Sequence, residues 1–564
     1  MHFNRFPHPD HWLQNAASLA MSALLARLDL AHDARPFFWI DLRQQPPQAS
    51  HSYWDRCDIA GRFVDGLVLA RQMTGRTDHV DAEILLRDFL WAQQDPEDGL
   101  FYNWEGDNQP NAEMSKYLPD LDSSTFHRHV DLFCQRSPLL AMTTLLALGD
   151  ESMRPRLQQM VRGLLTLAER TGDELRFPTY RWAREIRPEW VQGTNAPEKW
   201  LGYRYALLTG LARYVELAEE PEAVDLALGL ARFYMRHGDV PPDGRFAANT
   251  HSGGVLPATV GIARLGVWAG DTEMVAWANR VYLWVRENTP EFGFLLDGLG
   301  LDGFFAGTCE TCGLADLVHL ALVLTEAGAG DHWDDIERIA RNQLLENQYR
   351  HPDRIRQLYP GIAENVLAMM HGGFECAAYP NRLLTWVGVE GCCIGGGIRA
   401  LYLAWRGALT DRDGESWVNL GFSRTTPAVQ VIGHEPWRGQ IDVRAHAPRQ
   451  VHIRVPGHAG RAQVRTLIEG QDADVGWQGP YATFALQAGQ TATLSYPLPE
   501  SNRSYQIAGQ TYQARWRGAT MVEIQPTGEG YPTYQRQHLW AEDSSAEAEP
   551  PQVAETPEPV PFLW

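Results

Sequence analysis

Residues 309–324 read CETCGLADLVHLALVL, a cysteine motif that runs directly into an apolar pattern. The apolar positions recur at intervals of three and four residues, at Leu314, Leu317, Val318, Ala321 and Leu324. This spacing predicts an amphipathic helix that begins just after the motif. Unpaired N–H groups and the dipole at a helix N-terminus favour a thiolate, the form of cysteine that binds a metal or attacks an electrophile. The stretch therefore predicts a core helix with chemistry at its first turn.

A second cysteine cluster, Gly391-Cys392-Cys393-Ile394, also precedes a helical pattern, carried by Ile394, Ile398, Leu401, Tyr402 and Trp405. Four of the seven cysteines lie in these two clusters. An odd number of cysteines with an adjacent pair is a poor pattern for a secreted disulfide framework. Metal binding or catalysis fits the pattern better.

Helical periodicity recurs on both sides of these clusters, at 11–32, 56–75, 79–95, 130–148, 151–172, 199–219, 222–238, 255–270, 272–287, 311–328, 331–350 and 394–407. Short linkers alternate with long ones, and short linkers join antiparallel helices. Five helical hairpins follow directly, and the first and last helices are assumed to form the closing pair. The prediction is an (α/α)6 barrel over residues 1–415, with the long connections and both cysteine clusters on one face.

From about residue 416 the apolar pattern changes to a period of two, in 416–420, 429–432, 440–444, 451–455 and 492–496. Alternation between turn residues predicts an antiparallel β-sandwich over 416–540, closed by a hairpin at Arg517-Gly518. Residues 541–564 hold six acids, five prolines and no Lys or Arg, which predicts a disordered tail. The predicted fold class is thus mainly α with a C-terminal β domain.

The formal net charge of -21 argues against nucleic acid or an anionic membrane as a partner, because both require clustered Lys and Arg. The N-terminal residues show no basic and apolar signal pattern, and no segment has eighteen uncharged apolar residues. We therefore expect a cytoplasmic protein.

Glu310, Cys312, Cys392 and Cys393 together offer one carboxylate and three thiolates, which suits a tetrahedral Zn²⁺ shell. Cys309 is a spare candidate, since it forms Cys-x-x-Cys with Cys312. A structural zinc site, a catalytic zinc-thiolate and ordinary buried thiols remain open. The adjacent cysteine pair is unusual for a zinc finger and favours catalysis.

These residues resemble a known family. Glu310-Thr311-Cys312, the Cys392-Cys393 pair, the preceding helical barrel, and the later segments 512–518 (YQARWRG) and 531–536 (YPTYQR) resemble the β-L-arabinofuranosidase-type glycoside hydrolases of family 127 and its uncharacterised relatives. The resemblance implies a retaining hydrolase in which zinc is bound by Glu310, Cys312, Cys392 and Cys393. It also implies that Cys392 attacks the anomeric carbon of a short oligosaccharide or glycoside.

The sequence departs from the family at the general acid/base. The family's loop glutamate corresponds to Phe294, and the nearby carboxyls are Glu291, Asp297 and Asp302. Asp297 is the chosen acid/base, because apolar surroundings would raise its pKa. The alternative is that these acids cap turns among glycines.

A second departure concerns sugar contacts. Where the family has a His-Ala-Asn-Thr-like run, residues 247–251 read AANTH, which leaves Asn249 and His251 as predicted substrate-binding residues. Tyr379 and Trp386 are predicted to stack against the sugar. For each of these the plain alternative is a structural role in the core.

Two other functions compete with hydrolysis. One is a non-catalytic carbohydrate-binding or assembly protein in which zinc is purely structural. The other is a lyase or epimerase that uses His251 or Tyr379 as a base. By analogy with related barrels, a homodimer is also expected.

Overall fold

The computed structural model describes residues 13–104, 128–178, 181–182, 201–240, 244, 250–299 and 307–536. Within these ranges six helices form a closed inner ring: α2 (Asp58–Thr74), α5 (Leu132–Ala147), α8 (Leu208–Ala218), α10 (Ser252–Ala269), α12 (Thr311–Glu326) and α16 (Cys392–Ala408). Each inner helix packs against the next, and α16 packs against α2. The ring is therefore complete.

A second layer of helices surrounds this ring: α1 (Leu13–Ala26), α3 (Val80–Trp91), α6 (Met153–Leu167), α9 (Pro221–His237), α11 (Thr272–Glu287) and α13 (Trp333–Ile339). Five of them pack on the inner helix that precedes them in the chain, and α1 packs on α16. The inner helix α12 is buried continuously from Thr311 to Leu324, whereas α6 buries one face only. The predicted (α/α)6 barrel is confirmed, including its closing pair.

Glycines allow the inner helices to approach each other closely. A Cβ added at Gly61 of α2 would lie 2.5 Å from the backbone of Ser137 in α5. A Cβ at Gly261 of α10 would lie 2.4 Å from the backbone of Leu208 in α8. These contacts hold neighbouring inner helices close together around one central space.

Several predicted helices are shorter or divided. The first ends at Ala26 and is followed by β1 (Leu28–Asp29), and the predicted helix 199–219 is split into α7 (Leu201–Tyr205) and α8. The predicted helix 331–350 becomes α13 and a π-helical turn, Ala340–Leu344. The long connection before α16 contains two helices that periodicity did not predict, α14 (Pro352–Leu358) and α15 (Glu364–Met370). Pro352 occupies the first turn of α14, where its missing N–H is harmless.

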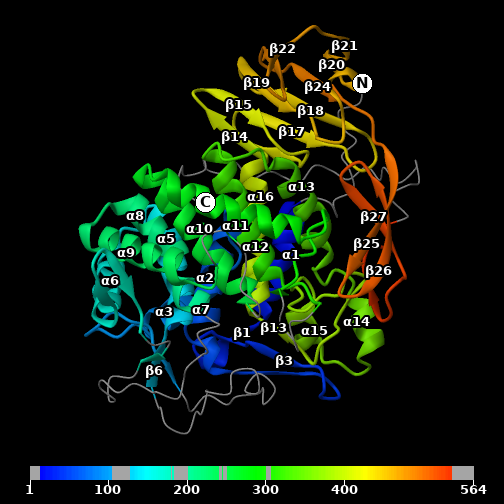
Figure 1. Cartoon of the computed structure of the whole chain (residues 1–564). Helices are drawn as coiled ribbons and strands as arrows, with labels where there is room; N and C mark the ends of the chain where they lie inside the picture. The colour runs from blue at the N-terminus through cyan, green and yellow to red at the C-terminus, as the bar shows by residue number, and fades with distance from the viewer. Residues whose placement is uncertain are drawn as a thin grey trace.

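Two sheets follow the barrel and lie on one side of it (Figure 1). One has the order β14-β15-β19-β23-β22, formed by Leu409–Arg412, Glu415–Val418, Arg449–Arg454, Tyr481–Leu486 and Gly476–Gln478. The other has the order β16-β17-β18-β24-β20-β21, formed by Arg424–Thr425, Val429–Gly433, Gln440–Ala445, Thr491–Ser495, Arg465–Ile468 and Gln471–Asp472. They share a separate apolar core that includes Val443, Val451 and Phe484. The predicted sandwich is confirmed, although β15 and β19 pair in parallel.

The hairpin predicted at Arg517-Gly518 exists but does not close the sandwich. It joins β26 (Gln510–Arg517) to β27 (Thr520–Gln525) in a separate sheet with β25 (Glu500–Ile507). Tyr512, Trp516 and Ile524 from this sheet belong to the core of the helical body. The predicted tail, 541–564, lies outside the described residues.

Short strand pairs connect the loops next to the inner helices. β3 (Trp39–Asp41) pairs with β4 (Gln48–Ser50) and with β13 (Gly388–Glu390), which leads into α16. β10 (Thr250–His251) leads into α10 and pairs with β11 (Gly298–Leu299). The remaining pairs or small sheets are β1 with β2 (Arg35–Pro36), β5 (Asn103–Trp104) with β6 (Arg128–Asp131) and β9 (Arg181–Trp182), β7 (Glu169–Thr171) with β8 (Glu174–Arg176), and β12 (Arg382–Leu383) with β28 (Tyr531–Pro532).

Among the helices of the described residues, none combines the length and the apolar character needed to cross a bilayer.

Candidate active site

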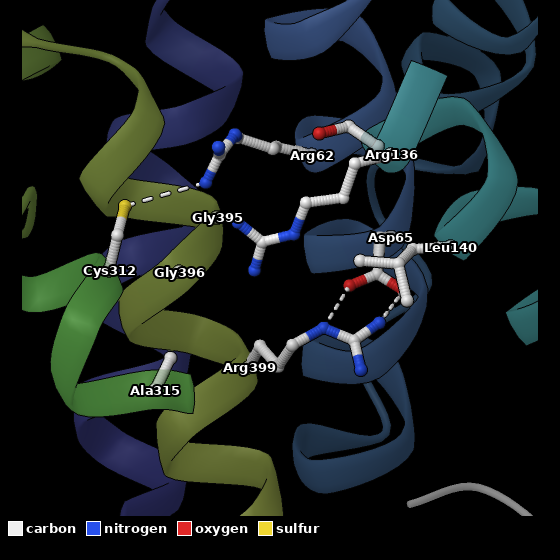
Figure 2. Close-up of a pocket in the computed structure, with 10 residues that line it drawn as sticks. Arg62, Asp65, Arg136, Leu140, Cys312, Ala315, Gly395, Gly396 and Arg399 are labelled. Atoms are coloured by element: carbon white, nitrogen blue, oxygen red, sulfur yellow. Dashed lines mark hydrogen bonds and ion pairs between the residues drawn. The ribbon is translucent and has the colours of Figure 1, made fainter. Parts of the chain in front are cut away.

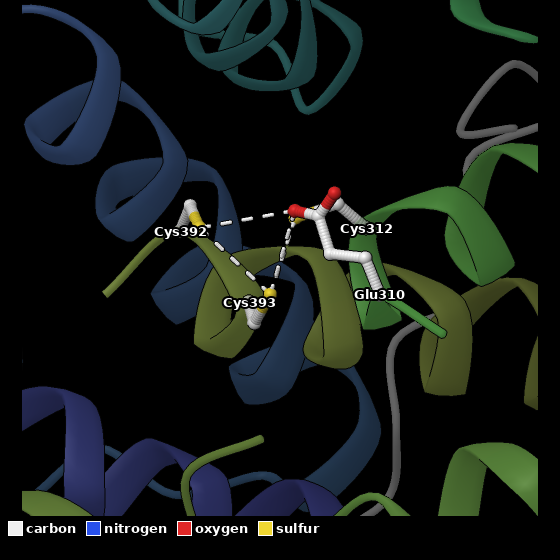
Figure 3. A group of neighbouring side chains, drawn as sticks. All are labelled: Glu310, Cys312, Cys392 and Cys393. Carbon is white, nitrogen blue, oxygen red and sulfur yellow. Dashed lines mark hydrogen bonds between the residues drawn. The ribbon is translucent and has the colours of Figure 1, made fainter. Parts of the chain in front are cut away.

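The two cysteine clusters meet at the first turns of two neighbouring inner helices (Figure 3). Glu310 is the N-cap of α12, but its side chain makes no capping hydrogen bond, so the carboxylate points toward the sulfurs. Cys312 lies in the first turn of α12, and Cys392 and Cys393 begin α16. The predicted placement of both clusters at helix N-termini agrees with these bounds.

The four ligand-type side chains form a compact group. The sulfur of Cys393 lies 3.7 Å from that of Cys312 and 3.8 Å from that of Cys392. The Oε1 atom of Glu310 lies 3.6 Å from the sulfur of Cys393 and 4.0 Å from that of Cys392. One ligand atom from each residue lies within 4.8 Å of all the others, so the group could hold a metal ion.

Ionisation of the three thiols is unequal. Hydrogen bonds from the thiols of Cys392 and Cys393 lower the pKa of Cys312 to about 6. The hydrogen bond to Cys312 raises the pKa of Cys392, and burial raises that of Cys393. One thiolate therefore forms readily, whereas three thiolates require a cation among them.

Arg62 supports this group from α2. Its Nη1 donates to the sulfur of Cys312 at 3.4 Å, and its Nε donates to Asp58 at 2.9 Å. The side chain of Arg62 is 10% exposed, so its charge acts on the sulfur with little screening by water.

A second group of titratable residues adjoins the thiols. Nε2 of His251 lies 2.8 Å from Oδ2 of Asp297 and 3.4 Å from Oε2 of Glu310, while Nδ1 faces the hydroxyl of Tyr203 at 2.9 Å. Ser252 donates to Oδ1 of Asp297 at 2.7 Å. Burial opposes the charged imidazole, but Asp297 and Glu310 raise the pKa of His251 to about 10. The predicted residues His251 and Asp297 thus join Glu310 in one cluster.

Asp297 is completely buried. Burial raises its pKa, as expected for a carboxyl in apolar surroundings, while His251 opposes the rise. Its two oxygen atoms face His251 and Ser252 rather than an open pocket. The residue at the family position, Phe294, is part of the apolar core.

Glu291 and Asp302 are the other two carboxyls that the sequence placed near the acid/base position. Glu291 accepts a hydrogen bond from Tyr505 and forms an ion pair with Arg503, so it anchors β25 to the barrel. Asp302 lies outside the described residues. Asn249, predicted to contact the sugar, also lies outside them.

Sequence reasoning missed Glu390. This residue ends β13, and its Oε2 lies 3.3 Å from the sulfur of Cys392. Burial, followed by the charge of Glu310, raises the pKa of Glu390 to about 8. The available signal was an acid two positions before the cysteine pair.

The two residues predicted to stack on a sugar, Tyr379 and Trp386, pack against other side chains of the protein. Tyr379 forms a β-bridge with Arg382, whose guanidinium lies 5.3 Å from the ring centre of Tyr379. Trp386 packs edge-on against Trp39 with ring centres 4.9 Å apart.

A different row of aromatic rings adjoins the thiol cluster. The ring of Tyr203 stacks on His251 at 5.4 Å, Phe133 packs on Tyr203 at 4.7 Å, and Trp54 follows at 6.2 Å. The row comes from four separate segments, so no local pattern in the sequence could reveal it.

No protein-family model and no curated protein sequence matches the chain. Solved structures do match it. A GH127 β-L-arabinofuranosidase from Geobacillus stearothermophilus T6 aligns with a TM-score of 0.55, covering 84% of this chain and 77% of that one at 14% identity. Another GH127 β-arabinofuranosidase aligns with a TM-score of 0.55, covering 89% and 78% at 13% identity. A protein described as a glycoside hydrolase aligns with a TM-score of 0.55, covering 82% of this chain and 77% of that one at 12% identity.

At these identities the likeness is one of fold. The chain has a glycoside hydrolase fold in which an (α/α)6 barrel carries a β-sandwich. More particularly, it has the GH127-like fold.

Proposed function

We propose that this protein is a metal-dependent retaining glycoside hydrolase that acts on a short oligosaccharide or glycoside. The observation that carries the proposal is the convergence of Glu310, Cys312, Cys392 and Cys393 at the first turns of α12 and α16. The GH127-like fold supports it, and two of the similar structures are described as arabinofuranosidases. A β-L-arabinofuranoside is therefore the first substrate to test.

Zinc is the metal that the donor set fits best. Zn²⁺ binds both cysteine sulfur and carboxylate oxygen in four-coordinate tetrahedral shells, and two sulfurs bound at about 2.3 Å in that geometry are about 3.8 Å apart. The observed separations of 3.7 and 3.8 Å agree with that value. A bound zinc would keep the three sulfurs deprotonated at neutral pH and fix their orientation.

The proposed reaction proceeds in two displacements. The sulfur of Cys392 attacks the anomeric carbon, the C–S bond forms, and the glycosidic C–O bond breaks as its oxygen takes up a proton. Water then attacks the same carbon, loses a proton and releases Cys392. Of the three cysteines in the group, Cys392 is the most exposed, at 7%, which suits it to meet a substrate.

Asp297 keeps the proposed role of proton donor and acceptor. An ion-pair contact with His251 and a hydrogen bond from Ser252 orient its two oxygens. Because Asp297 is fully buried, sugar binding must displace His251 from Oδ2 before the carboxyl can reach the glycosidic oxygen.

The test combines metal analysis with turnover of a panel of aryl furanosides and pyranosides. We expect one zinc per chain in the wild-type protein and turnover of at least one glycoside. Cys392→Ser should lose turnover but keep zinc, while Cys309→Ser serves as the matched control. Cys309 is a buried cysteine three residues before Cys312 but lies outside the group that could hold a metal.

The burial of Asp297 favours a second candidate, a carbohydrate-binding protein with a structural metal. In that case no glycoside in the panel turns over, and metal removal lowers only the melting temperature. That pair of results would exclude the hydrolase.

A further inference from the structure

A narrow cavity of about 20 Å³ lies inside the helical ring next to Cys312 (Figure 2). Its lining comes from α2, α5, α12 and α16 and includes three arginines, Arg62, Arg136 and Arg399. Apolar surface from Leu140 and Ala315 completes much of the wall. None of these arginines takes part in the proposed displacement steps, so the cavity needs a separate explanation.

Arg136 leaves a hydrogen-bond donor unused at this cavity. Its Nη2 donates to both oxygens of Asp316, at 2.8 and 2.9 Å, but its Nε has no partner and the residue is only 5% exposed. A buried donor without an acceptor destabilises the folded state, because its lost hydration is not replaced. The guanidinium projects into the space between Arg62 and Arg399 in Figure 2.

More unused donors lie near these arginines. Arg213 donates to the hydroxyl of Thr144, while its Nε and Nη2 have no partner. Nε2 of His319 accepts from Arg264 at 3.3 Å, so the neutral ring carries its proton on Nδ1, which has no partner. These unpartnered atoms of Arg136, Arg213 and His319 are all donors, so the ring interior requires an acceptor.

The arginines that line the cavity are paired with acids. Arg62 pairs with Asp58, Arg136 with Asp316, and Arg399 with Asp65, as the short ion-pair distances show: 2.9, 2.8 and 2.6 Å. Arg264 pairs with Glu216. Arg213 contacts a hydroxyl instead of a carboxylate. Because Cys312 at the cavity also ionises readily, its thiolate offsets the charge of Arg213, so the acceptor is required by the unused N–H donors and not by a net charge.

We propose that the cavity bounded by Arg62, Arg136 and Arg399 binds a single monatomic anion, chloride, inside the helical ring. The anion accepts from the guanidinium N–H groups, including the unpartnered Nε of Arg136. A cavity of about 20 Å³ admits one water-sized species, which excludes sulfate, phosphate and sugar acids. The cavity adjoins the metal-binding group, because Cys312 belongs to its lining and Arg62 contacts both the cavity and Cys312.

Bromide provides a direct probe of this site. Crystals of the full chain grown with sodium bromide in place of chloride should give an anomalous peak between Arg62, Arg136 and Arg399. The expected result is a bromide peak at this position in the wild-type protein. A cavity that contains only water, without an anomalous peak, would overturn the proposal.

Thermal unfolding tests the same site in solution. Replacing gluconate by chloride at constant ionic strength should raise the Tm of the wild-type protein saturably, by about 2 °C at 100 mM if that concentration is well above the Kd. Ala315→Val fills the cavity without removing a charge and should abolish the rise. Ala321→Val, on the same helix but outside the cavity lining, should retain it.

An equal Tm response in gluconate and chloride, or an unchanged response in Ala315→Val, would contradict the proposal. If Ala315→Val does not fold, the wild-type bromide peak still decides the question. Both readouts are independent of glycoside turnover, so they remain valid if the proposed hydrolase activity is wrong.

Discussion

Replacing Arg62 by glutamine should weaken metal binding without removing a metal ligand. Arg62 donates to the sulfur of Cys312 at 3.4 Å and to Asp58 at 2.9 Å, and only 10% of its side chain is exposed. At 3.4 Å and an effective dielectric constant of about 20, a full positive and a full negative charge attract by about 5 kcal/mol. Solvation of the variant and the glutamine N–H groups recover part of this energy.

The expected net loss is therefore smaller than the Coulomb energy. Side chains that hold metal ligands by hydrogen bonds typically contribute 10- to 100-fold to metal affinity, or about 1.4–2.8 kcal/mol. We expect Arg62→Gln to fall in the upper half of this range, because the contact is buried. Competition with a chromophoric zinc chelator at fixed pH measures the change in Kd.

Arg71→Gln provides the matched control. Arg71 lies on the same helix and forms an ion pair with Glu83 at 2.9 Å, remote from the sulfurs in sequence and contacts. The zinc affinity of the Arg71→Gln variant should equal that of the wild-type protein. Equal zinc affinity in Arg62→Gln and wild type, or an equal loss in both variants, would refute a specific role for Arg62.

Three further predictions concern the barrel and its β domain. Gly61→Ala should destabilise the fold by about 1–3 kcal/mol in urea unfolding, because its Cβ would lie 2.5 Å from α5, while Gly66→Ala, with 3.4 Å of room, should change stability less. Burial raises the pKa of Asp239 from 3.8 to about 7, so its contribution to stability is complete below pH 3.8 and is lost as pH rises toward 7. Asp239→Asn should flatten that part of the curve of Tm against pH, and an unchanged curve would contradict the shift. Arg341→Met should destabilise the protein by about 3–5 kcal/mol, because it leaves Glu337 buried without its partner at 2.6 Å; a loss below 1 kcal/mol would contradict this reasoning.

The barrel could be predicted because its signals are local. Helix α12 shows its apolar spacing within sixteen residues, and short linkers force successive helices to lie antiparallel. The short helices α14 and α15 escaped prediction because seven residues give too few turns to establish a period. The sequence also predicted the hairpin at Arg517-Gly518 that joins β26 and β27, but it could not show that Trp516 packs on the helices instead of the sandwich.

Some residues of the candidate site were also evident from local sequence motifs, whereas others were brought together only by the fold. The two cysteine motifs identified Glu310, Cys312, Cys392 and Cys393, because these residue types are unusual together and each motif precedes a helix. Glu390 was visible in the sequence but carried no signal beyond its proximity to the cysteine pair. Tyr203, Phe133 and Trp54 belong to separate segments, and only the closed ring brings them beside His251.

The sequence by itself determined the five helical hairpins, the change to strands and the two motifs that supply the metal-binding group, because each is a pattern of residues close together in the chain. Tertiary structure alone decided that Arg62 reaches Cys312 and that Asp297 is buried against His251. It also decided that three arginines surround one small cavity. The physical reason is that distances across the ring depend on how the helices pack, and close packing at positions such as Gly61 fixes them without leaving a periodic trace in the sequence.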